Sequence, residues 1–181
     1  MKIIAVYGSS RPGSLSAGLM DEILRGAADA GHEIVRLNIN QLQFRGCIGC
    51  QGCKRAGSDC ILKDDLAPYF AQLHEAGALV LSAPNYMGQV SGNMVAFMNR
   101  HYCIGGGPAK ASRLAPHTKL ISVSAQGAPV ELPDSEANYR WFHEVFLGMG
   151  FEDAGRFVVR GQAGANDAAL RETAYQAGRA L

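Results

Sequence analysis

Short apolar runs alternate with longer amphipathic stretches along the chain, and this alternation limits the possible folds more than any other feature. Residues 2–7 form an apolar run that ends at a glycine, and a helical stripe of apolar residues follows over 16–30. The run 78–82 is apolar throughout, as expected of a parallel strand covered on both faces. Five such strand–helix units without an internal repeat predict one parallel sheet with helices on both faces.

The remaining elements continue the same alternation. Further strands are expected at 33–37, 119–124 and 151–159, and further helices from Asp64-Asp65 onward and at 91–101, 134–149 and 167–181. Ligands of open parallel sheets bind beyond the carboxyl ends of the strands. The loops that follow Tyr7, Ser82 and Ser124 are therefore where a functional site is expected.

Composition sets the limits of size and partner. The 181 residues are 48% hydrophobic, which predicts a single domain over residues 1–181 with a full core. A net charge of +1, from 17 basic and 16 acidic residues, gives no strong field for nucleic acid or a membrane surface. No apolar run approaches the ~20 residues of a membrane span, and no signal-type leader precedes the first strand pattern. We therefore expect a cytoplasmic protein that binds neither nucleic acid nor membrane.

The first loop, residues 8–16, suits a phosphate group. Its glycines have the spacing of a nucleoside triphosphate loop, but Ser14 stands where the phosphate-binding lysine is needed. The loop is not G-x-G-x-x-G, and the second strand ends without an acid for a ribose. What remains is a helix start whose free backbone N–H groups, serine hydroxyls and one guanidinium suit a terminal phosphate monoester; the side chains are those of Ser9, Arg11, Ser14 and Ser16. The same serines would also serve as simple helix caps.

The loops after the third and fourth strands suit a flat ring. In residues 82–92, a proline and two glycines allow tight turns that present Tyr86 and Met87 as an apolar edge beside backbone N–H groups. Residues 124–127 form a small-residue turn that can approach the other side of a planar heterocycle. Taken singly, each loop also fits an ordinary turn.

Four of the five cysteines lie in a C-x₂-C-x₂-C-x₆-C run, at Cys47, Cys50, Cys53 and Cys60, within a loop at 44–63. Closely spaced thiolates of this kind suit an iron–sulfur cluster, and bacterial ferredoxins open with a similar C-x₂-C-x₂-C. A four-cysteine zinc site is the alternative, although such sites usually separate two C-x₂-C pairs by a longer stretch. Four reduced thiols on a loop are the remaining possibility.

Taken together, these motifs resemble the flavodoxin-like NAD(P)H-dependent FMN reductases and, within them, the iron–sulfur flavoproteins. The resemblance spans residues 1 to about 160 and is carried, in order, by Gly8-Ser9-Ser10-Arg11, Cys47 through Cys60, Asp64-Asp65-Leu66, residues 83–88, Ser91-Gly92 and Asn99-Arg100. The chain departs from the family pattern at Ala83, Val95 and Asn99, where serine, lysine and an acid are common. These departures bear on substrate preference more than on FMN binding.

The resemblance implies a three-layer sandwich with a five-stranded parallel sheet in the order 2-1-3-4-5. It also implies FMN with its phosphate at residues 9–16 and its ring between 84–88 and 124–127. The candidate FMN-binding residues are Ser9, Arg11, Ser14, Leu15, Ser16, Pro84, Asn85, Tyr86, Met87, Gly88, Ser124, Ala125, Gln126 and Gly127. No catalytic side chain is expected, because the flavin carries the chemistry.

The implied activity is electron transfer from NAD(P)H through FMN to a quinone, a flavin or another small-molecule acceptor. The alternative is an iron–sulfur flavoprotein with a [4Fe-4S] cluster at Cys47, Cys50, Cys53 and Cys60, acting as an electron-transfer module between a ferredoxin-like partner and FMN without NAD(P)H turnover. The resemblance further implies a homodimer or homotetramer, with Gly105-Gly-Gly-Pro108 and the Tyr86 loop contributing to the interface.

Overall fold

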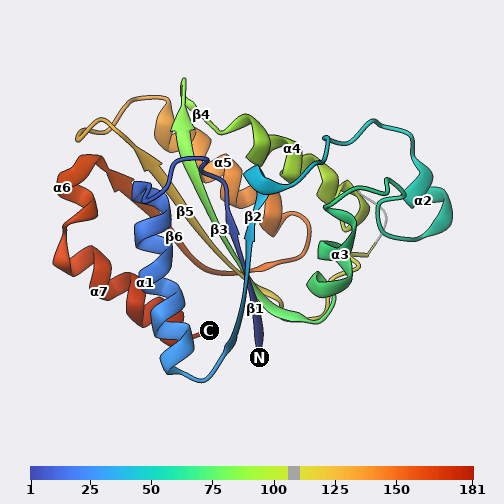
Figure 1. Cartoon of the computed structure of the whole chain (residues 1–181), viewed down its shortest axis with the longest axis horizontal. Coiled ribbons are helices and arrows are strands. Elements are labelled where there is room, and N and C mark those ends of the chain that lie inside the picture. The colour runs from blue at the N-terminus through green and yellow to red at the C-terminus, as the bar shows by residue number, and fades with distance from the viewer. Residues whose placement is uncertain (106–110) are drawn as a thin grey trace.

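The computed structural model describes residues 1–105 and 111–181, which form a sheet between two layers of helices (Figure 1). The sheet runs in the order β2-β1-β3-β5-β6, and every neighbouring pair on this path is parallel. Its strands are β1 (Lys2–Tyr7), β2 (Glu33–Asn38), β3 (Ala76–Tyr86), β5 (Lys119–Gln126) and β6 (Glu152–Arg160). The flavodoxin-like fold and the predicted order of the five parallel strands are therefore confirmed.

Helices cover both faces of the sheet (Figure 1). One face carries α1 (Leu15–Asp29), α6 (Gly161–Ala165) and α7 (Ala168–Arg179), and the other carries α3 (Ala67–Leu73), α4 (Gly92–Arg100) and α5 (Ser135–Leu147). Alternate residues of β1 serve the two cores: Ile3 and Ala5 pack toward α1, whereas Ile4 and Val6 pack toward α3, α4 and α5. The remaining elements are the 3₁₀ turns at Ile39–Gln41 and His101–Cys103, the short helix α2 (Gly52–Ala56) and the strand β4 (Gln89–Val90).

The third strand is longer than predicted. Residues 83–86, expected as part of a loop, continue β3, and β4 pairs antiparallel with its end at Asn85–Val90 and Tyr86–Gln89. Met87 and Gly88 form the tip of this hairpin with positive φ angles of 55° and 82°. The loop prediction for 83–86 was wrong because Pro84, which suggested a turn, lies within the parallel pairing with β5, opposite Ala125.

One helix boundary also differs from the prediction, and one short helix was missed. Asp64 and Asp65 precede α3 rather than open it, and Asp64 accepts a hydrogen bond from the Leu66 backbone N–H at 3.2 Å. The closing helix predicted at 167–181 is α7, which Asp167 caps by accepting the N–H groups of Ala169 (2.9 Å) and Leu170 (3.2 Å); the short helix α6 before it was not predicted.

Part of the predicted interface loop, residues 106–108 of Gly105–Pro108, lies outside the described residues. Among the residues that are described, no helix has the length and apolar character to cross a membrane.

Candidate functional site

A cavity of about 510 Å³ lies at the carboxyl edge of the sheet, where the three predicted loops meet. It lies within the size range of small-molecule and cofactor sites, roughly 300–1,000 Å³. Four segments line it, after β1, at the end of β3, at the end of β5 and after β6, with the residues Ser9, Arg11, Pro12, Gly13, Ser14, Leu15, Ser16, Pro84, Asn85, Tyr86, Ala125, Gln126, Gly127 and Gln162. The topology therefore brings together most of the residues that the sequence singled out.

The loop after β1 is held closely against β3. The Gly8 N–H donates to the Ser82 carbonyl at 2.8 Å, and the Ser91 hydroxyl donates to the Gly8 carbonyl at 2.9 Å. A Cβ at position 8 would lie 2.6 Å from the Ser82 oxygen and from the Met94 methyl group, so only glycine fits there. Glycine at this position thus sets where the rest of the loop enters the cavity.

The start of α1 forms the polar end of the cavity. Ser14 is the N-cap, and its hydroxyl accepts from the Ala17 N–H at 3.3 Å and lies 3.4 Å from the Ser16 hydroxyl. The capping role that the sequence left open is therefore present. The first N–H groups of any α-helix lack intrahelical acceptors, and the helix dipole makes this end positive. Together with the exposed Arg11 beside it, this end of the cavity suits an anion.

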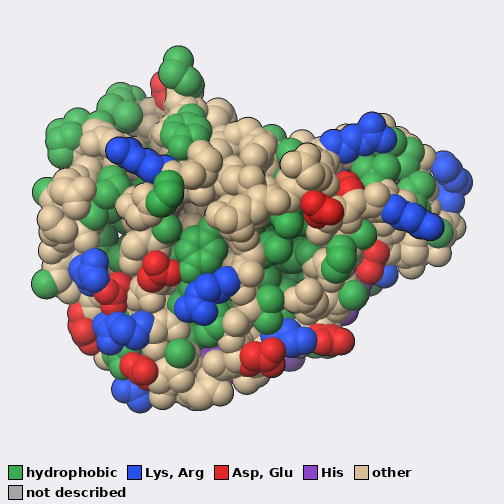
Figure 2. Space-filling model, in the orientation of Figure 1, with side chains coloured by type: hydrophobic (Ala, Val, Ile, Leu, Met, Phe, Trp, Pro, Cys, Tyr) green, Lys and Arg blue, Asp and Glu red, His purple; other side chains and the backbone are tan. Residues whose placement is uncertain are grey.

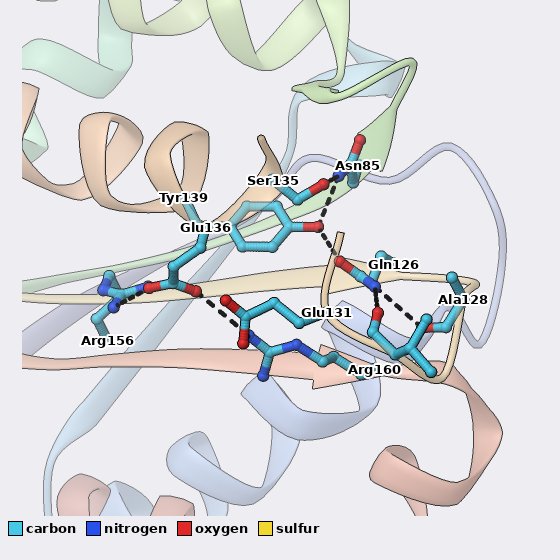
Figure 3. Close-up of polar contacts among 10 residues, drawn as sticks. Asn85, Gln126, Ala128, Glu131, Ser135, Glu136, Tyr139, Arg156 and Arg160 are labelled. Atoms are coloured by element: carbon cyan, nitrogen blue, oxygen red, sulfur yellow. Dashed lines mark hydrogen bonds and ion pairs between the residues drawn. The ribbon is translucent and has the colours of Figure 1, made fainter. Parts of the chain in front are cut away.

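The other end of the cavity is organised by a buried tyrosine from α5 (Figure 3). Asn85, at the end of β3, donates through Nδ2 to the Tyr139 hydroxyl at 2.6 Å and to the Ser135 hydroxyl at 3.0 Å. Tyr139 in turn donates to Oε1 of Gln126, at the end of β5, at 2.8 Å. The ends of β3 and β5 are thus connected through one side chain that neither strand supplies.

An ion-pair cluster beside this network ties the start of α5 to β6 (Figure 3). Glu136 accepts from Arg156 at 2.6 Å and from Arg160 at 3.3 Å, and Glu131 lies 3.7 Å from Arg160. These side chains are partly exposed, so each pair contributes modestly, but together they fix the helix turn that carries Tyr139.

Three of the predicted FMN-binding residues do not line the cavity. Met87 is fully exposed at the hairpin tip, and the Gly88 carbonyl accepts a hydrogen bond from Asn138. Ser124 is completely buried within β5, and within the described part of the chain its hydroxyl has no hydrogen-bond partner. The other eleven predicted residues line the cavity, and whether they bind FMN stays a prediction.

Three cavity residues escaped the sequence-based prediction: Pro12, Gly13 and Gln162. The first two lie inside the loop that was already identified. Gln162 follows the last parallel strand, whose carboxyl end lies at the same edge of the sheet, so that position was the available signal.

The cysteine-rich segment projects from the body beside α3 and α4 (Figure 1). All four of its cysteines line one small cavity, together with Ile48, Gln51, Ile61, Leu62 and Tyr102. Cys47 and Cys50 are exposed, Cys60 is half-buried and Cys53 is buried at the start of α2, a helix that the sequence-based prediction missed. In the described part of the chain, no group of three or more His, Cys, Asp or Glu side chains is arranged to hold a metal ion. The thiols therefore share one space without forming a preformed metal site.

Polar contacts hold this segment to the body. Asp59 accepts from Arg113 at 2.9 Å and lies 2.8 Å from Nε2 of His74. Lys54 reaches the carbonyl of Gly105 and lies over the Tyr102 ring, 4.4 Å from its centroid. The segment is therefore anchored to the body between its third and fourth cysteines.

The same segment is basic. Residues 44–63 carry Arg45, Lys54, Arg55 and Lys63 against one acid, Asp59, whereas the whole chain has a net charge of +1. In Figure 2, Lys and Arg side chains border the part of the surface that projects over this segment. The rest of the molecule is accordingly slightly acidic.

A serine, a histidine and an aspartate also form a hydrogen-bonded chain, in the order of a hydrolase triad. The Ser122 hydroxyl lies 2.8 Å from Nδ1 of His143, and Nε2 of His143 lies 3.1 Å from Asp153. Burial lowers the pKa of His143. Ser122 is completely buried inside the sheet, so its hydroxyl has no access to a substrate. The three hydrogen-bonded side chains therefore have a structural role in the core.

The fold and the cavity define a flavodoxin-like protein with a helix start at one end of its cavity. The family model for NADPH-dependent FMN reductase matches residues 1–129, and the chain belongs to this family.

Three comparisons place the chain among its relatives. An iron-sulfur flavoprotein of Methanocaldococcus jannaschii is 33% identical over 100 residues, which are 55% of this chain and 51% of that protein. An iron-sulfur flavoprotein of Archaeoglobus fulgidus is 27% identical over 132 residues, 73% of this chain and 59% of that protein. The chain thus spans about half the length of the curated relatives it matches. The structure of an NAD(P)H:quinone oxidoreductase from Methanothermobacter marburgensis aligns over 99% of this chain and 96% of that chain, with a TM-score of 0.73 and 18% identity, which shows the shared fold.

Proposed function

We propose that the chain is an FMN-dependent oxidoreductase that binds FMN in the 510 Å³ cavity. The phosphate would lie at the start of α1, against Ser9, Arg11 and Ser14. The ring would lie between the end of β3, at residues 84–86, and residues 125–127. One observation carries this proposal: a single cavity joins the start of α1, which suits an anion, to the ends of β3 and β5.

The residues present fit the proposed cofactor. Ser9 and Ser14 are buried at the polar end with hydroxyl groups that can donate, and Arg11 supplies a charge. Tyr86 lies half-exposed beside the other end, where its ring can cover a planar heterocycle. When bound, FMN supplies the hydride-transfer and electron-transfer chemistry. The side chains bind the phosphate, orient the ring and exclude water from one of its faces.

NAD(P)H is the proposed electron source, and a quinone, a free flavin or another small molecule is the proposed acceptor. The name of the family, NADPH-dependent FMN reductase, supports the electron source. Steady NAD(P)H oxidation by the FMN-loaded protein upon addition of a quinone tests this activity. Oxidation no faster than with free FMN at the same concentration would contradict it.

Flavin binding itself is tested by comparing FMN with riboflavin, which lacks the phosphate. We expect Arg11→Ala to weaken FMN about ten- to hundredfold, the range for a hydrogen bond to a charged group, and to leave riboflavin unchanged. Arg179→Ala, at an exposed arginine near the end of α7, is the matched control and should leave both affinities unchanged. Equal affinities of Arg11→Ala and the parent for FMN would place the phosphate elsewhere.

The second candidate is an iron–sulfur flavoprotein that transfers electrons between FMN and a ferredoxin-like partner. Two observations favour it: four thiols line one cavity, and the relatives reported above carry this name. Thiolates are the ligands that such clusters require, so the donor set fits in chemistry. The two candidates differ in turnover, because the second predicts an electron-transfer protein that does not oxidise NAD(P)H.

A further inference from the structure

We infer that Tyr139 is a positioning residue for the flavin ring, which turns the Asn85 carboxamide so that its oxygen is the atom offered to the ligand. This inference rests on the proposed FMN site. Its basis is a chain of hydrogen bonds whose direction is fixed at one end by the backbone (Figure 3).

The orientation of the Gln126 side-chain amide sets the donor-to-acceptor direction of these hydrogen bonds. Nε2 of Gln126 lies 3.1 Å from the Ala128 carbonyl and 2.6 Å from the Val130 carbonyl. A carbonyl oxygen only accepts, so the atom facing both must be the amide nitrogen. Rotating the Gln126 amide by half a turn would place three oxygens together. Its Oε1 therefore faces Tyr139 as an acceptor.

The Tyr139 hydroxyl then determines how the Asn85 side-chain amide is oriented. Its hydroxyl is buried and has one hydrogen, which is donated to Oε1 of Gln126 at 2.8 Å. Toward Asn85, 2.6 Å away, the hydroxyl can only accept. The Asn85 atom that faces it must be Nδ2, whose second hydrogen goes to the Ser135 hydroxyl at 3.0 Å. Both hydrogens of the Asn85 amide are thus occupied on the protein side.

The consequence is that Asn85 presents a hydrogen-bond acceptor, and no donor, at the cavity wall. Asn85 lines the cavity, and its carboxamide has only the Oδ1 atom left to offer. This oxygen selects a ligand edge that presents an N–H group. The pyrimidine part of the flavin ring carries such an imide N–H between two carbonyl oxygens. An edge that presented only acceptors would be repelled.

A double-mutant cycle tests the inference on the full chain, with FMN and riboflavin as probes. Tyr139→Phe removes the hydroxyl and frees the Asn85 amide to rotate. We expect both flavins to bind about three- to tenfold more weakly by the same factor, the range for one lost hydrogen bond. In an Asn85→Ala background, Tyr139→Phe should have no further effect, because it acts through Asn85.

Tyr69→Phe is the matched control. Tyr69 is an equally buried tyrosine whose hydroxyl lies 2.7 Å from Nε2 of His101, in the core under α3 and α4. It should leave both flavin affinities unchanged. Asn85→Asp is a second variant, which keeps the shape of the side chain and presents an oxygen whichever way the carboxylate turns. In this background Tyr139→Phe should also have no further effect on either flavin.

Each contrary outcome overturns the inference. Equal losses of flavin affinity in Tyr69→Phe and Tyr139→Phe would mean that both changes act by destabilising the core in general. Additive losses in the Asn85→Ala background would mean that Tyr139 does not act through Asn85. A loss confined to FMN would place the effect at the phosphate end. Unchanged binding by Tyr139→Phe, or a further loss from Tyr139→Phe in the Asn85→Asp background, would remove the positioning role. If the parent protein bound neither flavin, both the proposed function and this inference would be contradicted. If the parent binds flavin and only the variants behave unexpectedly, the inference alone is contradicted.

Discussion

Arg100, near the end of α4, donates to Asp64 across the base of the cysteine-rich segment, with 2.6 Å between Nη1 and Oδ2. The same nitrogen donates to the Arg45 carbonyl at 3.0 Å. Arg45 precedes the first cysteine and Asp64 follows the last, so one buried guanidinium holds both ends of the segment. The cysteines lie on a loop that is closed at its base.

Asp64→Ala should destabilise the protein strongly. The Arg100 side chain is completely buried, and without Asp64 its charge would lack a counter-ion. Removing one partner of a buried pair costs about 3–5 kcal/mol. Urea unfolding would measure this as a lower midpoint with a similar slope. Glu75→Ala is the control, because it breaks an exposed pair with Lys2 and should leave the midpoint unchanged. A midpoint for Asp64→Ala close to that of the control would contradict the anchoring role.

Stability should fall in mild acid because of His101. Burial lowers the pKa of His101 from 6.5 to about 4, and its ring contacts the Tyr69 hydroxyl and the Phe97 carbonyl. The unfolded chain binds a proton below pH 6.5, whereas the folded chain resists it until about pH 4. The contribution is therefore fully present above pH 6.5 and is lost as the pH falls toward 4, to a total of ~3 kcal/mol.

Unfolding free energies measured between pH 7.5 and 4.5 would test this expectation. His101→Gln cannot be protonated in this range and should flatten the slope. Part of the slope should remain, because burial lowers the pKa of His143 in the same direction. A slope that is identical in parent and variant would assign the acid sensitivity to other groups.

Two glycine-to-alanine changes should act in opposite directions. At Gly8 the new Cβ would meet the Ser82 carbonyl at 2.6 Å, so the loop that enters the cavity must shift. We expect lower stability, by about 1–3 kcal/mol, and weaker FMN binding. At Gly18, within α1, a Cβ meets no atom within 4 Å, so alanine should stabilise the helix by about 0.5–1 kcal/mol. Thermal unfolding and an FMN titration of both variants measure this contrast, and a stabilised Gly8→Ala would refute the close contact.

The chain should associate into a dimer or tetramer, as the resemblance implied. An open apolar groove of about 320 Å³ lies between the ends of α4 and α5, lined by Met98, Tyr102, Trp141, Val145 and Met149 among others. Trp141 is 42% exposed, which is unusual for so large a side chain on a free surface. Light scattering should give a multiple of 19.3 kDa, and Trp141→Glu should lower the measured mass. A monomeric mass for the parent protein at micromolar concentration would contradict this prediction.

The sheet could be predicted because each strand carries its own signal. The run 78–82 is apolar without interruption, and the five strand–helix units leave few possible topologies. The end of β3 could not be predicted, because Pro84 is a turn signal and only the pairing with β4 and β5 makes residues 83–86 a strand. Local sequence does not report such pairing.

Most of the cavity could be predicted from the rule that strand ends meet at one edge. The contact between Asn85 and Tyr139 could not, because 54 residues separate the two. Tyr139 belongs to no motif, and helical periodicity identifies it only as a core residue of α5. The role that we infer for it depends on a hydroxyl group directed between the ends of β3 and β5, which only the three-dimensional structure shows.

The last prediction concerns the four cysteines, which we expect to act as one site. They line a single cavity on a segment that is closed at its base, so their thiols lie close enough together to be drawn around one bound group. Anaerobic reconstitution with iron and sulfide should therefore give about four of each per chain, as for a four-iron cluster with four thiolate ligands. Zinc without sulfide would indicate a structural site instead, and no metal would leave an FMN reductase with a thiol-rich loop.

Cysteine variants distinguish a shared site from adventitious metal. Cys53→Ala removes a buried thiol of the set and should abolish most of the bound iron and sulfide together, because a cluster is lost as a unit. Cys103→Ala is the matched control, since Cys103 is also buried but lies outside the run, and its thiol donates to the Arg100 carbonyl. It should keep the parent's iron and sulfide content. Equal loss in both variants, or retention of iron in Cys53→Ala, would show that the metal is not held by Cys47, Cys50, Cys53 and Cys60 as one set.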